Sequence, residues 1–266
     1  MKNFAICCNH EIQNSVQVKD KLVKILSDNN IKAKVFDIDS LKTGFDFVFV
    51  IGGDGTILKT ARFYAKYQTP IFGINLGRLG FLSQSSELEI NTAVGKILSG
   101  KYILQDRIML KSNQYTALND FVIKNCDSGR TSKFSLKIND KFVCDYLADG
   151  IIISTPTGST AYGLSAGGPV LHPALNVFVI VPICPHTLTA RPIVIPDGEK
   201  ITVCTDDKNI LSADGQEFYE FNKEISIEKS EFNAKLALID NSDFYSVLKN
   251  KLNWATTPTY MKHANF

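Results

Sequence analysis

The sequence predicts an α/β N-terminal domain with a parallel sheet in residues 1–100, followed by an antiparallel, β-sandwich-like C-terminal domain in residues 101–244. Up to Gly100, strand-like apolar runs alternate with segments whose apolar residues recur at helical spacing. Beyond Gly100 the segments are short, rich in β-branched and aromatic residues, and separated by turn residues. A chain of 266 residues with 44% hydrophobic content is large enough for two modest domains.

The first half alternates between expected strands and expected helices. Residues 47–51 alternate aromatic and β-branched side chains, which is typical of a strand buried on both faces of a parallel sheet. Helices cover both faces of such a sheet, and ligands bind beyond the carboxyl ends of its strands. The expected strands are 3–8, 31–36, 47–51 and 70–75, and the expected helices lie within 18–30, 55–68 and 86–99.

The second half is predicted to consist mainly of strands. Turn residues such as Asn139 and Asp140 separate its apolar segments. The expected strands are 103–111, 115–124, 134–138, 142–147, 150–155, 193–195, 201–204, 225–228 and 234–239. Residues 244–254 are expected to form one short helix, and the tail 245–266 is expected to pack back on the first domain.

The charge of the chain limits its expected partners. With 29 Lys and Arg residues against 27 Asp and Glu residues, the formal charge is +2 and no block of like charges occurs. We therefore expect neither a nucleic acid nor a membrane as a partner, whereas a small anionic ligand needs only a few basic groups. The apolar run 177–184 is far shorter than the roughly 20 residues of a membrane span. The first residues lead into a strand rather than a signal peptide, so we expect a cytoplasmic protein.

The cysteines are expected to be structural thiols. The sequence has no C-x-x-C pair and no His/Cys cluster with the spacing of a zinc finger. Most cysteines fall in strand-like runs, where a reduced cysteine behaves as a small apolar residue. The six residues are Cys7, Cys8, Cys126, Cys144, Cys184 and Cys204. We therefore expect no metal site built from protein ligands alone.

One glycine-rich turn carries a single carboxylate. Residues 52–56 read Gly-Gly-Asp-Gly-Thr and follow the predicted strand 47–51, so Asp54 lies where a strand ends and a helix starts. Free N–H groups at a helix start favour anions such as phosphate, and glycines let a ligand approach the backbone. The alternative is that Asp54 only caps the helix and that the glycines only form the turn.

A second segment combines hydroxyl groups with glycines. Residues 156–169 follow the predicted strand 150–155 and read Pro-Thr-Gly-Ser-Thr-Ala-Tyr-Gly-Leu-Ser-Ala-Gly-Gly-Pro. Hydroxyl groups and glycines where a strand meets a helix provide a hydrogen-bonding surface for a ligand rich in oxygen and nitrogen. The alternative is a helix start that is capped by Ser and Thr.

Two further polar sites interrupt the apolar pattern. Asn119 and Asp120 lie within the predicted strand 115–124, and Asp149 precedes the predicted strand 150–155. An amide beside a carboxylate can bind a base edge and a ribose diol at once, because the amide donates and accepts while the carboxylate accepts from hydroxyls. As turn or bulge residues, all three would have a purely structural role.

Together these segments resemble the bacterial NAD kinases. The matching segments are residues 52–56, 73–82, 119–120, 149–162 and 185–192, and the match in order and spacing extends to Gln216. The Gly-Gly-Asp-Gly-Thr segment alone is shared with diacylglycerol and sphingosine kinases, and phosphofructokinase has a related one. The Gly-Ser-Thr-Ala-Tyr segment distinguishes the NAD kinases from these enzymes.

The resemblance implies transfer of the terminal phosphoryl group of ATP, or of inorganic polyphosphate, to the 2′-hydroxyl of the adenosine ribose of NAD, giving NADP. A divalent metal, expected to be Mg²⁺, would bind through the substrate phosphates. Asp54 would be the catalytic acidic residue, Thr160 and Tyr162 would lie near the adenine, and Asp149 would contact the nicotinamide half. The implied NAD-binding residues are Asp54, Gly55, Asn119, Asp120, Asp149, Thr157, Thr160, Ala161, Tyr162, Gly163, Leu164 and Ser165.

Further positions of the resemblance are less uniform within the family. Four residues fall at ligand-contact positions whose residue type varies, namely Lys59, Arg130, Cys184 and Gln216. Lys59 lies about one helical turn beyond Asp54 and would neutralise phosphate oxygens there, but a solvated helix lysine is an equal alternative. Asp120 stands where many members have glutamate, and Leu147 where some members have a basic residue.

Two alternative functions stay open. A lipid kinase of the diacylglycerol type would share the glycine-rich turn but would need an apolar acyl pocket, which residues 156–170 do not suggest. A non-catalytic NAD or NADP sensor would keep the pocket, and only the retained Asp54 argues against it.

The resemblance also implies a homodimer or homotetramer whose β-rich domains meet, with Arg130 as a candidate to reach the neighbouring subunit.

Overall fold

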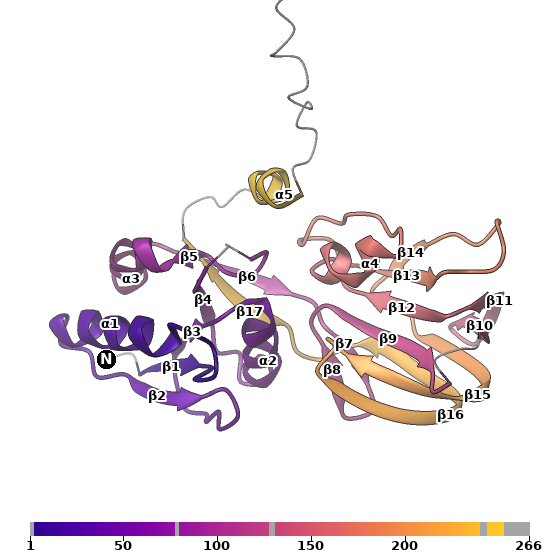
Figure 1. Ribbon diagram of the computed structural model, residues 1–266, viewed down its shortest axis with the longest axis horizontal. Helices are drawn as coiled ribbons and strands as arrows, with labels where there is room; N and C mark the ends of the chain where they lie inside the picture. Colours follow the sequence, from indigo (N-terminus) through magenta and orange to yellow (C-terminus); the bar gives the residue numbers. More distant parts are fainter. Residues whose placement is uncertain (1–2, 78–79, 128–130, 240–243, 253–266) are drawn as a thin grey trace, which may run out of the picture.

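The computed structural model describes residues 3–77, 80–127, 131–239 and 244–252 of the chain. These residues form two lobes that lie side by side, each built around one β-sheet (Figure 1). The strands of the N-terminal lobe pair mainly in parallel, and those of the second lobe pair antiparallel. The fold class predicted from the sequence is therefore confirmed.

The first sheet contains seven strands among the described residues, in the order β2-β1-β3-β4-β17-β6, with the short β5 beside β4. All of its pairs are parallel except β17 with β6. The strands are β1 (Phe4–Cys8), β2 (Lys34–Asp37), β3 (Phe47–Ile51), β4 (Ile71–Asn75), β5 (Ser85–Ser86), β6 (Ile103–Arg107) and β17 (Ala234–Leu238). Every residue of β1, β3 and β4 is buried, as expected for strands covered on both faces.

Helices cover both faces of this sheet, as the alternating pattern predicts (Figure 1). The helices are α1 (Ser15–Asp28), α2 (Asp54–Ala65), α3 (Ile90–Leu98) and the short η1 (Glu87–Glu89). Leu22 of α1 and Val94 of α3 share one core with Ile6 of β1. Ile57 of α2 belongs to a separate core with Val50 of β3. Because neighbouring residues of a strand face opposite ways, α2 covers the face opposite to α1 and α3.

The second sheet contains ten strands among the described residues, in the order β14-β13-β12-β9-β15-β16-β7-β8, with β10 and β11 attached through β15. The strands are β7 (Leu110–Ser112), β8 (Tyr115–Ala117), β9 (Asp120–Asn125), β10 (Ser132–Ile138), β11 (Lys141–Ala148), β12 (Gly150–Ser154), β13 (Val177–Ile183), β14 (Ile193–Pro196), β15 (Ile201–Ala213) and β16 (Glu217–Lys229). Two short helices, η2 (Gly158–Thr160) and α4 (Tyr162–Ser165), lie between β12 and β13.

The long strand β15 serves two parts of the second sheet. Its pairing with β16 shifts register between Cys204 and Lys208. The segment before the shift also pairs with β10, whereas the segment after it pairs with β9. Phe134 of β10, Ile153 of β12 and Val203 of β15 therefore meet in one core. This enclosure of apolar side chains between strands gives the lobe its sandwich-like character.

Two strands that were expected in the β-rich half belong to the first sheet instead. β17 lies between β4 and β6, with Leu236 opposite Ile71 and Ala234 opposite Arg107. Leu236 faces the core under α2, and its neighbour Ala237 faces the core under α1 and α3. β17 is thus buried on both faces, as an interior strand of a covered sheet must be. The chain consequently crosses between the lobes twice (Figure 1).

Two expected single strands are each divided in the structure. The predicted strand 103–111 is wrong as one element, because β6 ends at Arg107 in the first sheet and β7 starts at Leu110 in the second. The predicted strand 115–124 is divided at Leu118 and Asn119. Backbone N–H groups there bond to a carboxylate rather than to a neighbouring strand. A polar side chain therefore interrupts the ladder at this point.

The described part of the tail forms one helix, α5 (Phe244–Leu252). Its residues Phe244 and Val247 line a cavity together with Ile103 of the first sheet and His172 of the second lobe. The ring of Phe244 meets that of His172 edge-on, with 5.0 Å between the ring centres. The helix therefore contacts the second lobe and borders a cavity that the first lobe also lines, and residues 253–266 of the expected tail lie outside the described residues. None of the described helices is long and apolar enough to cross a membrane.

Candidate functional site

The carboxylate of Asp54 is held by the loop that follows β4. Helix α2 begins at Asp54, directly after the glycines that end β3. Asp54 Oδ2 accepts the N–H of Phe81 at 2.9 Å, and Oδ1 accepts that of Leu82 at 3.3 Å. A Cβ at Gly80 would lie 1.9 Å from Asp54 Oδ1, so this close approach requires glycine. Because the carboxylate binds a separate loop, Asp54 does more than cap its own helix.

Residues at the end of β12, just before the hydroxyl-rich segment 156–169, hold the Asn119 turn in place. Asn119 O accepts the N–H of Thr155 at 2.9 Å and the hydroxyl of Ser154 at 3.1 Å. The hydroxyl of Thr155 donates to Leu118 O at 2.6 Å. A Cβ at Gly158 would lie 2.1 Å from Asn119 O, so this glycine also permits a close approach. The two segments therefore form one continuous surface.

A cavity of about 550 Å³ opens between this surface and strands β9 and β15. It is lined by Asn119, Asp120, Val122, Lys124, Asn125, Cys126, Ala161, Tyr162, Ile210, Ser212, Asp214, Gly215 and Phe218. We call it the Tyr162 cavity. The ammonium of Lys124 lies 5.0 Å from the centre of the Tyr162 ring. An aromatic base with a ribose fits this lining, because Tyr162 and Phe218 offer ring faces and Asp120 offers hydrogen-bond acceptors.

A buried ion pair joins helix α2 to the Asn119 turn. Asp214 accepts the backbone N–H groups of Leu118, Asn119 and Asp120 at 3.0, 2.7 and 3.1 Å. Its carboxylate also pairs with Arg62 of α2 at 3.3 Å, and the two side chains are 0% and 6% exposed. Asp54 and Arg62 belong to the same helix, so this contact ties the Asp54 turn to the wall of the Tyr162 cavity.

Two carboxylates meet in this buried region. Burial raises the pKa of Asp120 to about 7, and the nearby charge of Asp214 adds to the effect. Burial also raises the pKa of Asp214, but the Arg62 guanidinium and three backbone N–H donors oppose the rise. Asp214 is thus the better stabilised anion, and Asp120 is the carboxylate that takes up a proton near neutral pH.

Gln216 links the β15–β16 turn directly to the glycine-rich turn. Its Nε2 donates to Gly55 O at 2.8 Å, and its Oε1 accepts from Arg62 Nη2 at 3.1 Å. Gly215, the preceding residue, lines the Tyr162 cavity. The cavity therefore lies beside the turn that carries Asp54, although the two turns belong to different lobes.

Thr157 and Thr160 line a second cavity rather than the Tyr162 cavity. This second cavity has a volume of about 340 Å³ and lies between the lobes, beneath α5. Phe81, whose N–H holds Asp54, also lines it. We call it the Arg107 cavity, because Arg107 at the end of β6 supplies its only arginine side chain among the described residues.

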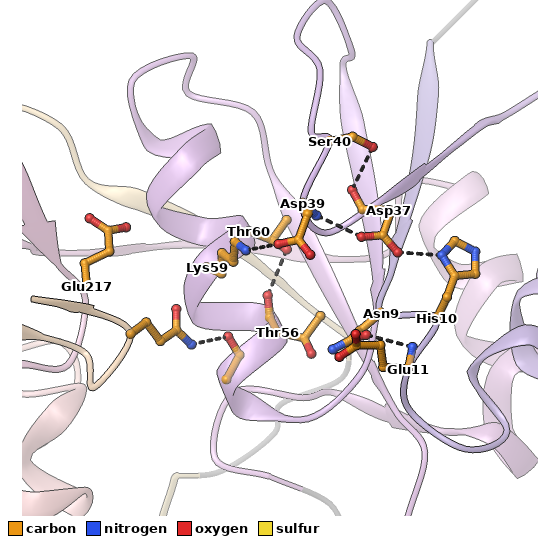
Figure 2. Close-up of polar contacts among 12 residues, drawn as sticks. Asn9, His10, Glu11, Asp37, Asp39, Ser40, Thr56, Lys59, Thr60 and Glu217 are labelled. Carbon is orange, nitrogen blue, oxygen red and sulfur yellow. Dashed lines mark hydrogen bonds and ion pairs between the residues drawn. The ribbon is translucent and has the colours of Figure 1, made fainter.

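Lys59 pairs with Asp39 of the same lobe in the described structure. Figure 2 shows its ammonium directed at Asp39, which follows β2, and the two side chains form an ion pair. Asp37, at the end of β2, pairs in turn with His10 at 2.5 Å. The Lys59 and Asp39 side chains are 40% and 78% exposed, so they form a solvated surface pair. This geometry favours the alternative of a surface lysine over a phosphate ligand.

The remaining predicted residues lie around the second lobe. Asp149 and Cys184 are both exposed and stand at adjacent strand ends, where Asp149 N donates to Ile183 O at 3.0 Å. Leu147 is 43% exposed nearby. Helix α4 also contains the three residues that follow Tyr162 in the sequence, Gly163, Leu164 and Ser165. None of the three lines the Tyr162 cavity. Arg130 lies outside the described residues.

Sequence reasoning missed the roles of Arg62, Arg107 and Asp214. Asp214 belongs to the last segment of the resemblance, but its side chain carried no signal of burial. The signal for Arg62 was its place in α2, eight residues after Asp54 and thus near the same face of the helix. Arg107 ends a strand that was expected in another sheet, so its neighbours could not be deduced.

Two family descriptions match the chain. Residues 8–102 match the ATP-NAD kinase N-terminal domain, and residues 118–239 match the ATP-NAD kinase C-terminal domain. A NAD kinase of Clostridium botulinum (strain ATCC 19397 / Type A) is 38% identical, with 96% of this chain and 97% of the relative covered. A NAD kinase of Thermoanaerobacter sp. (strain X514) is 36% identical, with 95% and 99% covered.

Two solved structures resemble this chain over most of its length. An NAD kinase from Archaeoglobus fulgidus, solved in complex with ATP, is 29% identical and superposes with a TM-score of 0.81 over 94% of this chain and 98% of its own. A yeast NADH kinase, solved with NADH, has the same fold, with a TM-score of 0.84 at 22% identity over 98% and 90% of the two chains. Since both family descriptions and relatives more than 30% identical cover nearly the whole sequence, the chain belongs to the bacterial NAD kinase family of phosphotransferases.

Proposed function

We propose that this chain transfers the terminal phosphoryl group of ATP to the 2′-hydroxyl of the adenosine ribose of NAD, giving NADP. The observation that carries the proposal is the contact between Gln216 and Gly55, which sets the Tyr162 cavity beside the Asp54 turn. Adenosine bound in that cavity presents its ribose toward Asp54. The Archaeoglobus relative was solved with ATP, which supports ATP as the donor.

The reaction requires in-line attack by the ribose oxygen on the terminal phosphorus. A bond forms between that oxygen and phosphorus, the bond from phosphorus to the bridging oxygen of ATP breaks, and ADP leaves. Asp54 orients the hydroxyl and accepts its proton late, because a carboxylate is a weak base toward an alcohol. The N–H groups of Phe81 and Leu82 hold the Asp54 carboxylate in position for this step.

We propose that Mg²⁺ is carried mainly by the donor phosphates. The described residues contain no cluster of three or more His, Cys, Asp or Glu side chains that could hold a metal. Mg²⁺ commonly binds through one or two carboxylates, several waters and substrate phosphates, so the single carboxylate of Asp54 fits this mode. When bound, the ion would neutralise the charge that develops on the transferred group.

The adenosine half of NAD is proposed to occupy the Tyr162 cavity. Tyr162 would stack on the base, and the ionised Asp120 would accept from a ribose hydroxyl. Asp149 and Cys184 lie outside this cavity at adjacent strand ends, and we propose that the nicotinamide half extends toward them. The resemblance assigns Thr157 and Thr160 to the NAD site, and both line the Arg107 cavity, so we propose that this cavity forms part of the NAD site.

Replacing Asp54 by Asn tests the central role. We expect NAD binding to persist while kcat for NADP formation falls by about 10²-fold or more, as on loss of an acid-base group. The measurement is an end-point assay of NADP with ATP and polyphosphate in parallel, with and without Mg²⁺. Asp39→Asn is the matched control, since it removes an exposed carboxylate that pairs with Lys59. Near-normal turnover in Asp54→Asn would remove this residue from the mechanism.

The same assay separates the two alternative functions. Radiolabelled ATP with diacylglycerol in place of NAD would label a lipid product only if the chain were a lipid kinase. A non-catalytic sensor would bind NAD without forming NADP above background. NADP formation by the unmodified chain would exclude both alternatives.

We propose a homodimer or homotetramer formed through the second lobe. The outer hairpin strand β11 exposes Phe142, Val143 and Leu147, with 64%, 40% and 43% of each residue accessible. Apolar side chains of this kind on one strand suit a subunit contact. Light scattering after gel filtration would measure the assembly, and a monomer at working concentration would contradict it.

A cytoplasmic location also stays part of the proposal. All six cysteines are free thiols in the structure, which suits a reducing compartment. Cell fractionation with an antibody to the chain would test the location.

A further inference from the structure

The hydroxyl group of Ser83 connects two parts of the loop that holds Asp54. Ser83 Oγ accepts the N–H of Gly80 at 2.7 Å and the side-chain N–H of Asn75 at 3.2 Å. Ser83 and Asn75 are 3% and 6% exposed, so both hydrogen bonds are made away from water. A buried donor that loses its acceptor destabilises the arrangement around it. One hydroxyl group therefore ties the middle of the loop to the end of β4.

The backbone of Ser83 is anchored on the first sheet. A Cβ at Gly73 of β4 would lie 3.2 Å from Ser83 Cα, so the two backbones are in close contact. Gln84, the next residue, donates its N–H to Gly73 O at 2.9 Å, and β5 then pairs with β4. Every residue of β4 is buried. The position of Ser83 is therefore set by the packed interior of the sheet.

Gly80 and the two residues after it are the part of the loop that meets the Asp54 carboxylate. Phe81 and Leu82 donate their N–H groups to it at 2.9 and 3.3 Å. A Cβ at Gly80 would lie 1.9 Å from Asp54 Oδ1, so the backbone of Gly80 passes directly against this oxygen. Gly80 is joined to Phe81 by a rigid, planar peptide group, so a shift of Gly80 also moves the N–H of Phe81. The bond from Gly80 to the Ser83 hydroxyl therefore fixes the contacts of the carboxylate.

Ser83 itself reaches neither of the two cavities. Phe81, Leu82 and Gln84 line the Arg107 cavity, but Ser83 lines neither this cavity nor the Tyr162 cavity. Its side-chain oxygen faces Gly80 and Asn75 within the loop. A substrate in either cavity would therefore meet the neighbours of Ser83 rather than its hydroxyl group. An effect of this hydroxyl on the reaction has to pass through the loop.

We infer that Ser83 is a positioning residue for phosphoryl transfer, which holds the Asp54 carboxylate in place through the loop after β4, an inference that rests on the proposed function. The contacts run from β4 through Ser83 to Gly80, and from Phe81 and Leu82 to the carboxylate. Phosphoryl transfer depends on alignment of the attacking oxygen, and a misplacement of about 1 Å can cost about 10²-fold in rate. Ser83 therefore acts on the rate of transfer more than on substrate affinity.

Replacing Ser83 by Ala tests the inference in initial-rate assays of NADP formation with ATP. The change leaves two buried donors without their acceptor, so the loop relaxes and kcat should fall by about tenfold or more. KM for NAD and KM for ATP should change by smaller factors. Ser85→Ala is the matched control, because Ser85 is equally buried and its hydroxyl donates to Ser86 O at 3.0 Å, away from the loop. Its kcat should equal that of the unmodified chain, and an equal kcat in Ser83→Ala would overturn the inference.

A second background shows whether Ser83 acts through Asp54. In Asp54→Asn the carboxylate is already absent, so Ser83→Ala should lower the remaining kcat by a much smaller factor than in the unmodified chain. A merely structural role would give the same factor in both backgrounds, and that result would overturn the inference. Ser83→Cys replaces the oxygen by a weak acceptor of similar shape and should give an intermediate kcat. It carries both comparisons if Ser83→Ala does not fold.

Hydrogen exchange reports the same contacts without any reaction. In NMR spectra of the full chain, the amides of Phe81 and Leu82 should exchange faster in Ser83→Ala than in the unmodified chain, and Ser85→Ala should leave them unchanged. Equal protection in Ser83→Ala would overturn the positioning role. The inference and the proposed function fail differently. If the unmodified chain forms no NADP, the proposed function is lost, whereas exchange that depends on Ser83 would still show that this hydroxyl positions the loop at Asp54.

Discussion

Asp120 and Asp214 share one buried region, and the Arg62 guanidinium opposes the charge of Asp214. Asp214 is surrounded by three N–H donors and Arg62, whereas no hydrogen bond stabilises the Asp120 carboxylate in the structure described. The ordered turn is therefore built around Asp214. The Asp120 carboxylate can therefore still accept a hydrogen bond from a ligand hydroxyl, and its protonation depends on pH.

Replacing Asp120 by Asn should change how stability depends on pH. The pKa of Asp120 is raised from 3.8 to about 7 on folding, so the folded chain holds a proton that the unfolded chain has already released. The contribution of protonated Asp120 to the free energy of unfolding is fully present below about pH 4. It is lost as the pH rises through 7, and the loss is up to about 4 kcal/mol. Asp120→Asn removes the loss. Its melting temperature, compared with the parent chain, should therefore increase from pH 5 to pH 8.

The control for this comparison is Asp39→Asn, which alters an exposed carboxylate. Its difference from the parent chain should be about the same at both pH values. A constant difference for Asp120→Asn as well would show that Asp120 is not the group that titrates.

At the scale of elements, helix α2 carries two separate duties. Its first residue, Asp54, faces the loop after β4, and Arg62 two turns later binds the turn of the other lobe. Arg62 also donates to Ala213 O at 3.2 Å and pairs with Glu217 at 2.9 Å. The helix is thus the rigid piece that sets the distance between the Asp54 turn and the Tyr162 cavity.

Replacing only one partner of the buried Arg62–Asp214 ion pair should destabilise the fold more than expected from replacing both partners together. Arg62→Met leaves the Asp214 carboxylate buried without its cation and should lower the free energy of unfolding by about 3–5 kcal/mol. The double variant Arg62→Met with Asp214→Asn should cost less than the sum of the two single changes. Denaturant unfolding measures all four chains. Additive effects would contradict direct coupling.

A surface pair provides the comparison for that cycle. Lys111 and Glu231 form an ion pair whose side chains are 29% and 60% exposed. Lys111→Met should change the free energy of unfolding far less than Arg62→Met does, because solvent screens such exposed pairs.

The strand–turn–helix unit around Asp54 could be predicted because its signals are local. A buried apolar run, a glycine turn and a helical repeat are all read within about 20 residues. The partner of β17 could not be predicted in this way. Its sequence indicates a strand, but its neighbours β4 and β6 lie far away in the chain, and alternation does not specify partners at such separation. The neighbours of Arg107, at the end of β6, could not be predicted for the same reason.

For the site itself, sequence resemblance indicated the residues but not which of them meet. Asn119, Asp120, Ala161 and Tyr162 line one cavity, while Thr157 and Thr160 line another. Lys59 has the right spacing from Asp54, yet its ammonium pairs with Asp39. The direction of a side chain depends on the charges that other elements bring close to it. The spacing of residues along one helix does not reveal those charges.

At the scale of the whole molecule, two strands of the first sheet, β6 and β17, lie where the chain leaves the first lobe and where it returns. β6 enters the first sheet just before the chain crosses to the second lobe, and β17 returns from it. Because β17 lies between β4 and β6, the first sheet is incomplete without residues that follow the entire second lobe. The lobes are therefore not independent folding units.

A fragment of residues 1–107 should fail to fold by itself. Without β17 it leaves β4 without one neighbour and β6 without its only partner in the sheet described, so buried N–H groups and apolar side chains are exposed. Circular dichroism should show no cooperative thermal transition. The same fragment joined through a glycine-serine linker to residues 230–239 should regain one. A cooperative transition in the fragment alone would contradict the dependence on β17.

The late position of β17 also has a consequence for biosynthesis. A ribosome adds about 5–20 residues per second, so roughly 10 to 30 s pass between translation of β4 and emergence of the strand that pairs with it. During that interval the nascent chain presents an open sheet edge to the crowded cell. Chaperones that shield open sheet edges would therefore act on this chain while it is still being translated.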